Sequence, residues 1–270
     1  MPQLVQLQRD HESTGFVVIG NHVQSGDRKE ILGVVRTMKV NFTITSQGSV
    51  DVANKASTIP RAYLFNSKGE LVASGNPNEM KQTIKHLIQS EPHWLAAGKE
   101  YKKLGKLAAA LKQVKTFRPI IKKLNKEKMK EGDAKEEAVY LLKRIRSHGK
   151  RTLKKAKTLE SKDAYLALKV YKEVAVQWKG DKAGNKASER LKKLKKDKEF
   201  QTELKASTIA FHIRSELGKL IFVKGKVNLD HGRNKKIAGK VRQLNSVLTK
   251  KFAASKAAGS IESELKDHGF

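Results

Sequence analysis

The sequence has no cysteine, few prolines and few aromatic residues. The lack of cysteine excludes disulfides, thiolate nucleophiles and cysteine–metal sites within it. No apolar run approaches the ~18 residues that a membrane span needs, and residues 1–20 lack the basic-then-apolar pattern of a secretory signal. We therefore expect a soluble protein. Pro119 is the last of five prolines among 270 residues, so no proline interrupts a helix after it.

Acidic residues are scarce beside basic ones. The chain has 27 aspartates and glutamates against 57 lysines and arginines, a formal net charge of +30. Residues 1–92 hold ten basic and eight acidic residues, whereas residues 93–270 hold forty-seven and nineteen. This asymmetry predicts two regions with different surfaces, 1–92 and 93–270.

In the first region, helical and strand patterns alternate. We expect a helix over 2–13, a buried central strand in the apolar run 16–20, a helix over 25–38, a strand over 41–45, a hairpin of 61–65 with 70–74, and a helix over 76–89. The last helix places Met80, Ile84 and Leu87/Ile88 on one face. This order predicts an α/β fold with a mixed sheet.

Several phrases in this region resemble the thioredoxin-like superfamily, in its redoxin or TlpA-like type. They are "MPQL" at 1–4, "GFVVIGNHV" at 15–23 and "STIPRAYLFNSKGELVASG" at 57–75. The resemblance covers about a third of the chain and implies a thioredoxin-like α/β domain. It departs from the family pattern because both redox cysteines and the strand before them are absent. The domain would therefore be truncated, and Met1 would be an internal methionine of a longer parent; the alternative is a genuinely shortened domain.

The resemblance also implies a function. The parent would catalyse thiol–disulfide exchange and be periplasmic or secreted, whereas this sequence has no catalytic residue for that chemistry and gives no localisation of its own. Thr58, Ile59 and Pro60 would form a peptide-binding loop with a cis bond before Pro60. From the sequence alone, Pro60 is an ordinary strand-edge proline. No cofactor is implied.

The second region, 93–270, is rich in alanine, leucine and lysine, which favours helix throughout. Near 160–197, two apolar stripes flank the break "KGDKAG" and resemble a tetratricopeptide-type helix pair. The stripes consist of Ala164, Leu168, Tyr171, Ala175 and Trp178, then Ala183, Ala187, Leu191 and Leu194. We expect flanking helices over 136–160 and 234–256, a long helical stretch from His93, and a frayed tail over 253–270.

Basic clusters lie at 122–130, 143–157 and 190–198. They are consistent with phosphate neutralisation by a polyanion-binding region, or with an ordinary solvated lysine-rich surface. Lysine predominates, and base-edge recognition favours arginine. The aromatic residues are not interleaved with the clusters, as stacking platforms would be. These features favour the ordinary solvated surface. Non-specific contact with anionic partners is the alternative, and specific nucleic-acid recognition has the least support.

Other chemistry finds no support in the sequence. The eight histidines make no HExxH or other metal-ligand spacing, so no metal site is expected. Three functions remain in consideration. The first is a redoxin-type thioredoxin domain, for which enzyme activity stays open. The second is a non-catalytic adaptor that binds a peptide or protein at the Pro60 loop. The third is a non-specific polyanion-binding protein.

Overall fold

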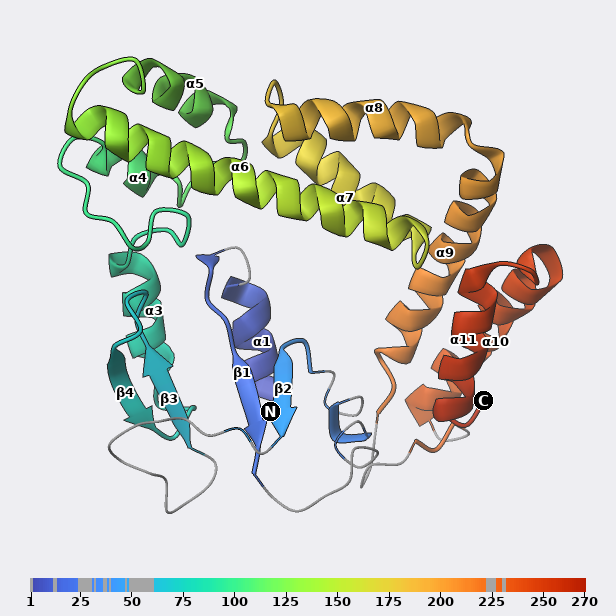
Figure 1. The fold of residues 1–270 in the computed structure, drawn as a ribbon. Coiled ribbons are helices and arrows are strands. Elements are labelled where there is room, and N and C mark those ends of the chain that lie inside the picture. The colour runs from blue at the N-terminus through green and yellow to red at the C-terminus, as the bar shows by residue number, and fades with distance from the viewer. Residues whose placement is uncertain are drawn as a thin grey trace. The chain divides into compact units, whose positions relative to one another are not determined.

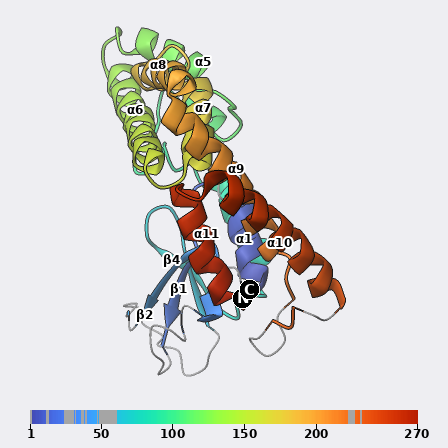
Figure 2. The ribbon, with the colours of Figure 1, turned by 90° about the vertical axis from the view of Figure 1, so that its right-hand side faces the viewer.

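The structure is a computed structural model that divides into two compact units. The first comprises Met1–Val114 with Lys126–Leu141, and the second comprises Lys115–Asn125 with Leu142–Phe270. Figures 1 and 2 show the ribbon in two views. The structure describes residues 2–11, 14–23, 31, 33–35, 38, 40–46, 48, 61–221, 227–229 and 232–270.

Helices dominate the described residues. They are α1 (Pro2–His11), α3 (Lys81–Ser90), α4 (Gly105–Ala110), α5 (Arg118–Glu127), α6 (Asp133–Glu160), α7 (Ala164–Gln177), α8 (Lys182–Lys196), α9 (Lys198–Leu217), α10 (Gly232–Phe252) and α11 (Lys256–Asp267). The strands are β1 (Ile19–His22), β2 (Thr43–Ser46), β3 (Ala62–Phe65) and β4 (Leu71–Gly75). Helix α6 contributes residues 133–141 to the first unit and 142–160 to the second.

In the first unit the strands form two separate sheets. Strands β1 and β2 pair in parallel, and β3 and β4 pair antiparallel as the predicted hairpin. The hairpin turn ends at Gly69, whose φ of 85° favours glycine. Leu64 of β3 packs with Met80 and Ile84, which confirms the predicted apolar face of α3.

The predicted α/β thioredoxin-like fold is wrong. About 64% of the chain is helical, and the described strands are four short ones in two two-stranded sheets. The apolar run 16–20 is not a buried central strand, because Val17 is 67% exposed and Ile19 is 65% exposed. The predicted helix over 25–38 lies largely outside the described residues. A long helix from His93 is also wrong, since turns precede the six-residue α4.

The second unit contains the helix pair expected near 160–197, as α7 and α8. Asp163 and Asp181 cap the two helices through their side chains. The turn between them includes Gly180, with a φ of 84°. The buried stripe of α7 differs from the predicted one, because it includes Ala167 and Val174. The tetratricopeptide resemblance of the pair stays a prediction, whereas the flanking helices are confirmed as α6 and α10.

Helices α9, α10 and α11 pack together around an apolar core and lie side by side in both views (Figures 1 and 2). Ile213, Val241, Leu248 and Ile261 are fully buried within it. The expectation that the tail frays is therefore wrong. Its stripe of Ala257, Ala258, Ile261 and Leu265 makes α11 amphipathic and anchors it to the core.

Candidate polyanion-binding surface

The sequence-predicted peptide loop, Thr58, Ile59 and Pro60, lies outside the described residues. Among the residues that are described, no group of histidine and carboxylate side chains is arranged to hold a metal ion. Within that same part of the chain, no helix is both long enough and apolar enough to cross a bilayer. The candidate site is therefore sought among the basic clusters of the helices.

Helix α6 carries a long stretch of charge of one sign, and α10 carries another, with seven basic residues and no acidic one. Between Glu137 and Glu160 the sequence has eight basic residues and no acidic one. The exposed ones are Lys143, Arg146, Lys150, Arg151, Lys154, Lys155 and Lys157. Along α6, Lys143, Lys150, Lys154 and Lys157 recur at helical spacing, so they project from one side. This row of cations extends over about 21 Å, at 1.5 Å per residue.

The opposite side of α6 is buried and fixes the helix in place. Leu141, Ile145 and Ala156 are fully buried. The indole Nε1–H of Trp178 donates to the Ile145 carbonyl at 3.1 Å. The Phe117 ring packs on the same indole with ring centroids 4.8 Å apart. The basic row is therefore presented by a rigid element rather than by a loop.

Arginines pair with four carboxylates of the second unit, namely Glu160, Asp163, Asp181 and Glu264. Arg146 of α6 pairs with Asp181 at 3.0 Å. Arg190 of α8 binds Glu160 of α6 with both Nε, at 2.9 Å, and Nη2. The planar guanidinium suits such bidentate pairing, and lysine does not.

Glu160 also accepts a hydrogen bond from the Tyr171 hydroxyl. The hydrogen bond from Arg190 lowers the pKa of Glu160, burial opposes it, and the bond from Tyr171 adds to the lowering. The pKa of Tyr171 is raised by burial and by its bond to Glu160. Glu160 is therefore an anion whose charge is already neutralised inside the protein.

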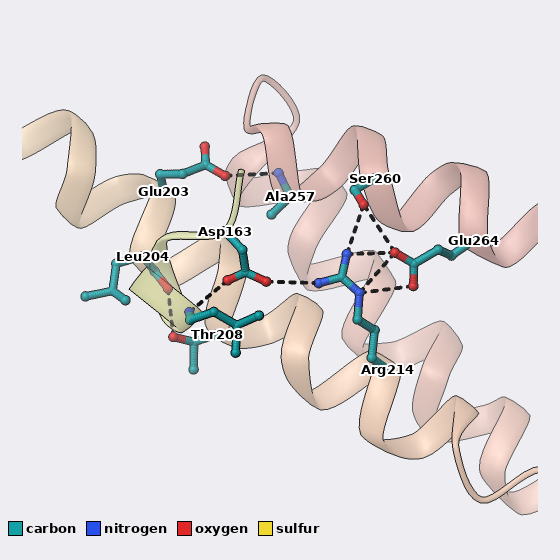
Figure 3. A network of polar contacts seen from close by, with 9 residues as sticks. Asp163, Glu203, Leu204, Thr208, Arg214, Ala257, Ser260 and Glu264 are labelled. Carbon is teal, nitrogen blue, oxygen red and sulfur yellow. Dashed lines mark hydrogen bonds and ion pairs between the residues drawn. The ribbon is translucent and has the colours of Figure 1, made fainter. Parts of the chain in front are cut away.

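A third arginine joins α7, α9 and α11 (Figure 3). Arg214 of α9 contacts both oxygens of Glu264 from α11, at 2.7–3.0 Å. Its Nη1 lies 3.4 Å from Asp163, and its Nη2 donates to Ser260 at 2.9 Å. Nearby, Glu203 accepts the backbone N–H groups of Lys256 and Ala257 at the start of α11. This network is structural, because it joins the starts of α7 and α11 to α9.

Most of the exposed cations outside these pairs are lysines, although Arg151 of α6 is exposed as well. Among the residues that the structure describes, no carboxylate lies within 4.0 Å of Lys150, Lys154 or Lys155 on α6. On α8 the same holds within the described chain for the exposed side chains of Lys182, Lys186, Lys192, Lys193, Lys195 and Lys196. The helical spacing of these lysines was readable from the sequence. The ion pairs between arginines and carboxylates could not be predicted from the sequence, because they depend on tertiary contacts.

A cavity in the first unit offers a contrasting environment. Its volume is about 610 Å³, and both signs of charge line it, including Lys103, Lys130, Glu127, Glu131 and Asp133. Beside it, Glu137 already accepts the backbone N–H groups of Lys102 and Leu104, each at 2.7 Å. An anion would meet carboxylates here, so this cavity is not the candidate site.

Comparison with protein-family models, with curated proteins and with solved structures finds no match to this chain. Among the residues that the structure describes, no metal-ligand set lies on α6, and its exposed lysines and arginines attract anions electrostatically. This surface suits phosphate, sulfate or carboxylate groups that repeat along a polymer.

Proposed function

We propose that the protein is a non-catalytic binding protein that holds a polyanion on the basic face of α6. One observation carries this proposal: eight basic residues follow one another along α6 without an acidic residue, on a helix whose apolar side is fixed in a core. A rigid row of one sign is typical of an electrostatic binding face.

Two other functions have less support. Thiol–disulfide exchange requires cysteines that the sequence lacks, and the α/β fold that accompanied that prediction is wrong. Peptide binding at Thr58–Pro60 stays a prediction, because those residues lie outside the described part of the chain. Neither function accounts for the basic face of α6.

The test compares two charge-matched triple variants in salt-dependent binding to a fluorescent single-stranded oligonucleotide. One variant replaces Lys150, Lys154 and Lys157 on α6 by glutamine. The control replaces Lys192, Lys195 and Lys196 on α8. Each lost phosphate contact reduces the slope of log affinity against log salt by about 0.7 for single strands, so the α6 variant loses up to ~2 from the slope.

The control is expected to keep the wild-type slope within half a unit. Glutamine preserves helix propensity, and thermal unfolding of both variants checks the fold. Equal reductions of the salt slope in the two variants would show that net charge alone determines binding, and would overturn the assignment to α6. Wild-type binding that does not change with salt would overturn polyanion binding itself.

A further inference from the structure

We infer that the polyanion is a duplex nucleic acid, gripped at its phosphates by two lysine rows on α6 and α8 without regard to base sequence. This inference rests on the proposed function. It adds that α8 takes part in binding, that the ligand is a duplex nucleic acid, and that binding does not depend on base sequence. It follows from the way in which two ion pairs hold α6 beside α8.

The two ion pairs define the side of α6 that faces α8. Arg146 binds Asp181 at the start of α8, and Glu160 binds Arg190 in its middle. Arg146 and Glu160 are fourteen residues apart, close to four helical turns, so they lie on the same side of α6. Both contacts advance along the two helices in the same direction, so α6 and α8 run parallel to each other.

Unpaired lysines occupy the same sides of both helices. Lys150 and Lys157 lie on the α6 stripe between Arg146 and Glu160. On α8, Lys186 and Lys193 precede and follow Arg190 by four and three residues, so they share its side. All four side chains are exposed, and none has a carboxylate within 4.0 Å in the part of the chain that the structure describes.

Between α6 and α8, the two ion pairs are therefore flanked by exposed lysines on both helices. The paired groups, Arg146 with Asp181 and Arg190 with Glu160, supply no net charge. The four lysines supply four positive charges along the two helices, and these charges attract an external anion. We call this feature the lysine track; it consists of Lys150, Lys157, Lys186 and Lys193.

A duplex fits the lysine track better than a single strand. The two rows are fixed by folded helices, and a duplex offers phosphates at fixed positions on two strands. A flexible single strand would have to be ordered to reach both rows. It would also gain nothing from stacking, because the exposed residues of α6 between Lys143 and Lys157 and of α8 include no aromatic ring.

The side chains of α6 and α8 also disfavour recognition of base sequence and binding to a membrane surface. Guanidinium groups are the side chains best suited to guanine edges, and the two that join α6 and α8 are held by Asp181 and Glu160. Lysines remain for the ligand, and they contact phosphates as point charges. An interfacial membrane helix needs an apolar face free to insert, whereas Leu141, Ile145 and Ala156 of α6 are buried.

The experiment measures binding of the full chain to four probes over a range of salt. The probes are a 24-base-pair duplex, one of its strands, a second duplex of unrelated sequence, and vesicles of phosphatidylserine with phosphatidylcholine. The variants are K150Q/K157Q, K186Q/K193Q and the control K192Q/K195Q. For the duplex we expect each row variant to lower the salt slope by about 1.8, at 0.9 per contact.

Relative to 1 M salt, a slope lower by 1.8 corresponds at 0.15 M salt to roughly a thirtyfold loss of duplex affinity for each row variant. The control variant is expected to bind the duplex with an affinity within threefold of that of the wild type. The wild type is expected to bind the two duplexes with affinities within threefold of each other. Three outcomes would overturn the duplex inference while polyanion binding stands. They are equal affinity for the duplex and the single strand, a loss of duplex affinity in K150Q/K157Q but not in K186Q/K193Q, and stronger binding to the vesicles than to the duplex. A tenfold preference between the duplexes would overturn sequence independence, and no binding to any probe would overturn both proposals.

Discussion

Trp178 lies so close to Gly149 that no side chain fits between them. A Cβ atom added at position 149 would come within 2.7 Å of the indole Nε1. That nitrogen donates to the carbonyl of Ile145, one turn earlier in α6. Glycine in a helix interior costs about 1 kcal/mol relative to alanine. Its presence here is explained by the indole, which needs the space of the missing Cβ to reach the carbonyl.

This relationship predicts the effect of three glycine-to-alanine variants. Gly149→Ala is expected to destabilise, because the clash with a fully buried indole exceeds the gain in helix propensity. Gly184→Ala is expected to destabilise more, since its Cβ would lie 2.1 Å from the backbone oxygen of Trp178, which cannot rotate away. Urea unfolding should show losses of about 1–3 kcal/mol, as for other overpacked sites.

Gly239 of α10 is the matched control, because a Cβ there would meet nothing within 4 Å. Gly239→Ala is expected to raise the free energy of unfolding by up to about 1 kcal/mol. If Gly149→Ala stabilised the protein as much as Gly239→Ala, the indole would not occupy the position assigned to it.

The bond between Arg190 and Glu160 predicts a pH dependence of stability. The pKa of Glu160 is lowered in the folded protein, chiefly by Arg190. A carboxyl with a depressed folded pKa contributes stability above its unfolded value of about 4.3 and loses it as pH falls through the folded pKa. Glu160→Gln should therefore be less stable than wild type at pH 7, with the difference shrinking toward pH 3.

Thermal unfolding of both proteins between pH 7 and pH 3 measures this difference. Glu189→Gln on the exposed face of α8 is a control with the same change of charge. A Glu160→Gln difference that stays constant across the range would mean that the carboxylate charge contributes nothing to the fold.

Local sequence patterns predicted the positions of the strands and of most helices, but not the burial of the strands or their arrangement in two separate sheets. The α7–α8 pair and the 61–65/70–74 hairpin follow from spacing and turn residues, and both are present. The burial of the run 16–20 was predicted wrongly. Its β-branched residues favour a strand at the edge of a sheet as well as in its centre, and burial depends on partner strands that residue spacing does not reveal. The prediction for the tail was wrong because chain ends commonly fray, whereas Ile261 is buried in the core of α9, α10 and α11.

The candidate site was predicted only in outline. The cluster at 143–157 was visible in the sequence as charge, and the absence of interleaved aromatics was visible too. The lysine track was not, since it requires knowing that Arg146 reaches Asp181 and that Glu160 reaches Arg190. Pairs between residues thirty or more positions apart are set by tertiary packing, which a single sequence does not record.

In the first unit, Glu137 is a buried cap for the turn before α4. Its carboxylate accepts three backbone N–H groups, from Lys102, Lys103 and Leu104. Burial raises its pKa, but these hydrogen bonds, with the Lys99 charge, outweigh burial and lower it overall. Glu137→Gln is expected to cost about 1–3 kcal/mol at pH 7, because an amide oxygen replaces a charged acceptor. The loss should diminish below pH 4, measured by urea unfolding.

Glu136→Gln, one position earlier and exposed, is the control and should change stability little. Equal effects of the two variants would show that the charge near the start of α6, and not the three hydrogen bonds, is responsible.

Arg214 predicts how α11 is held. Its guanidinium contacts Glu264 and Ser260 on α11 and Asp163 before α7. Arg214→Lys keeps the charge but loses the fork, so we expect a loss of about 1–2 kcal/mol, less than for a fully buried pair because the side chain is 35% exposed. Hydrogen exchange should quicken first in α11. Arg233→Lys, exposed on α10, is the control, and unchanged exchange in α11 of Arg214→Lys would contradict the assignment.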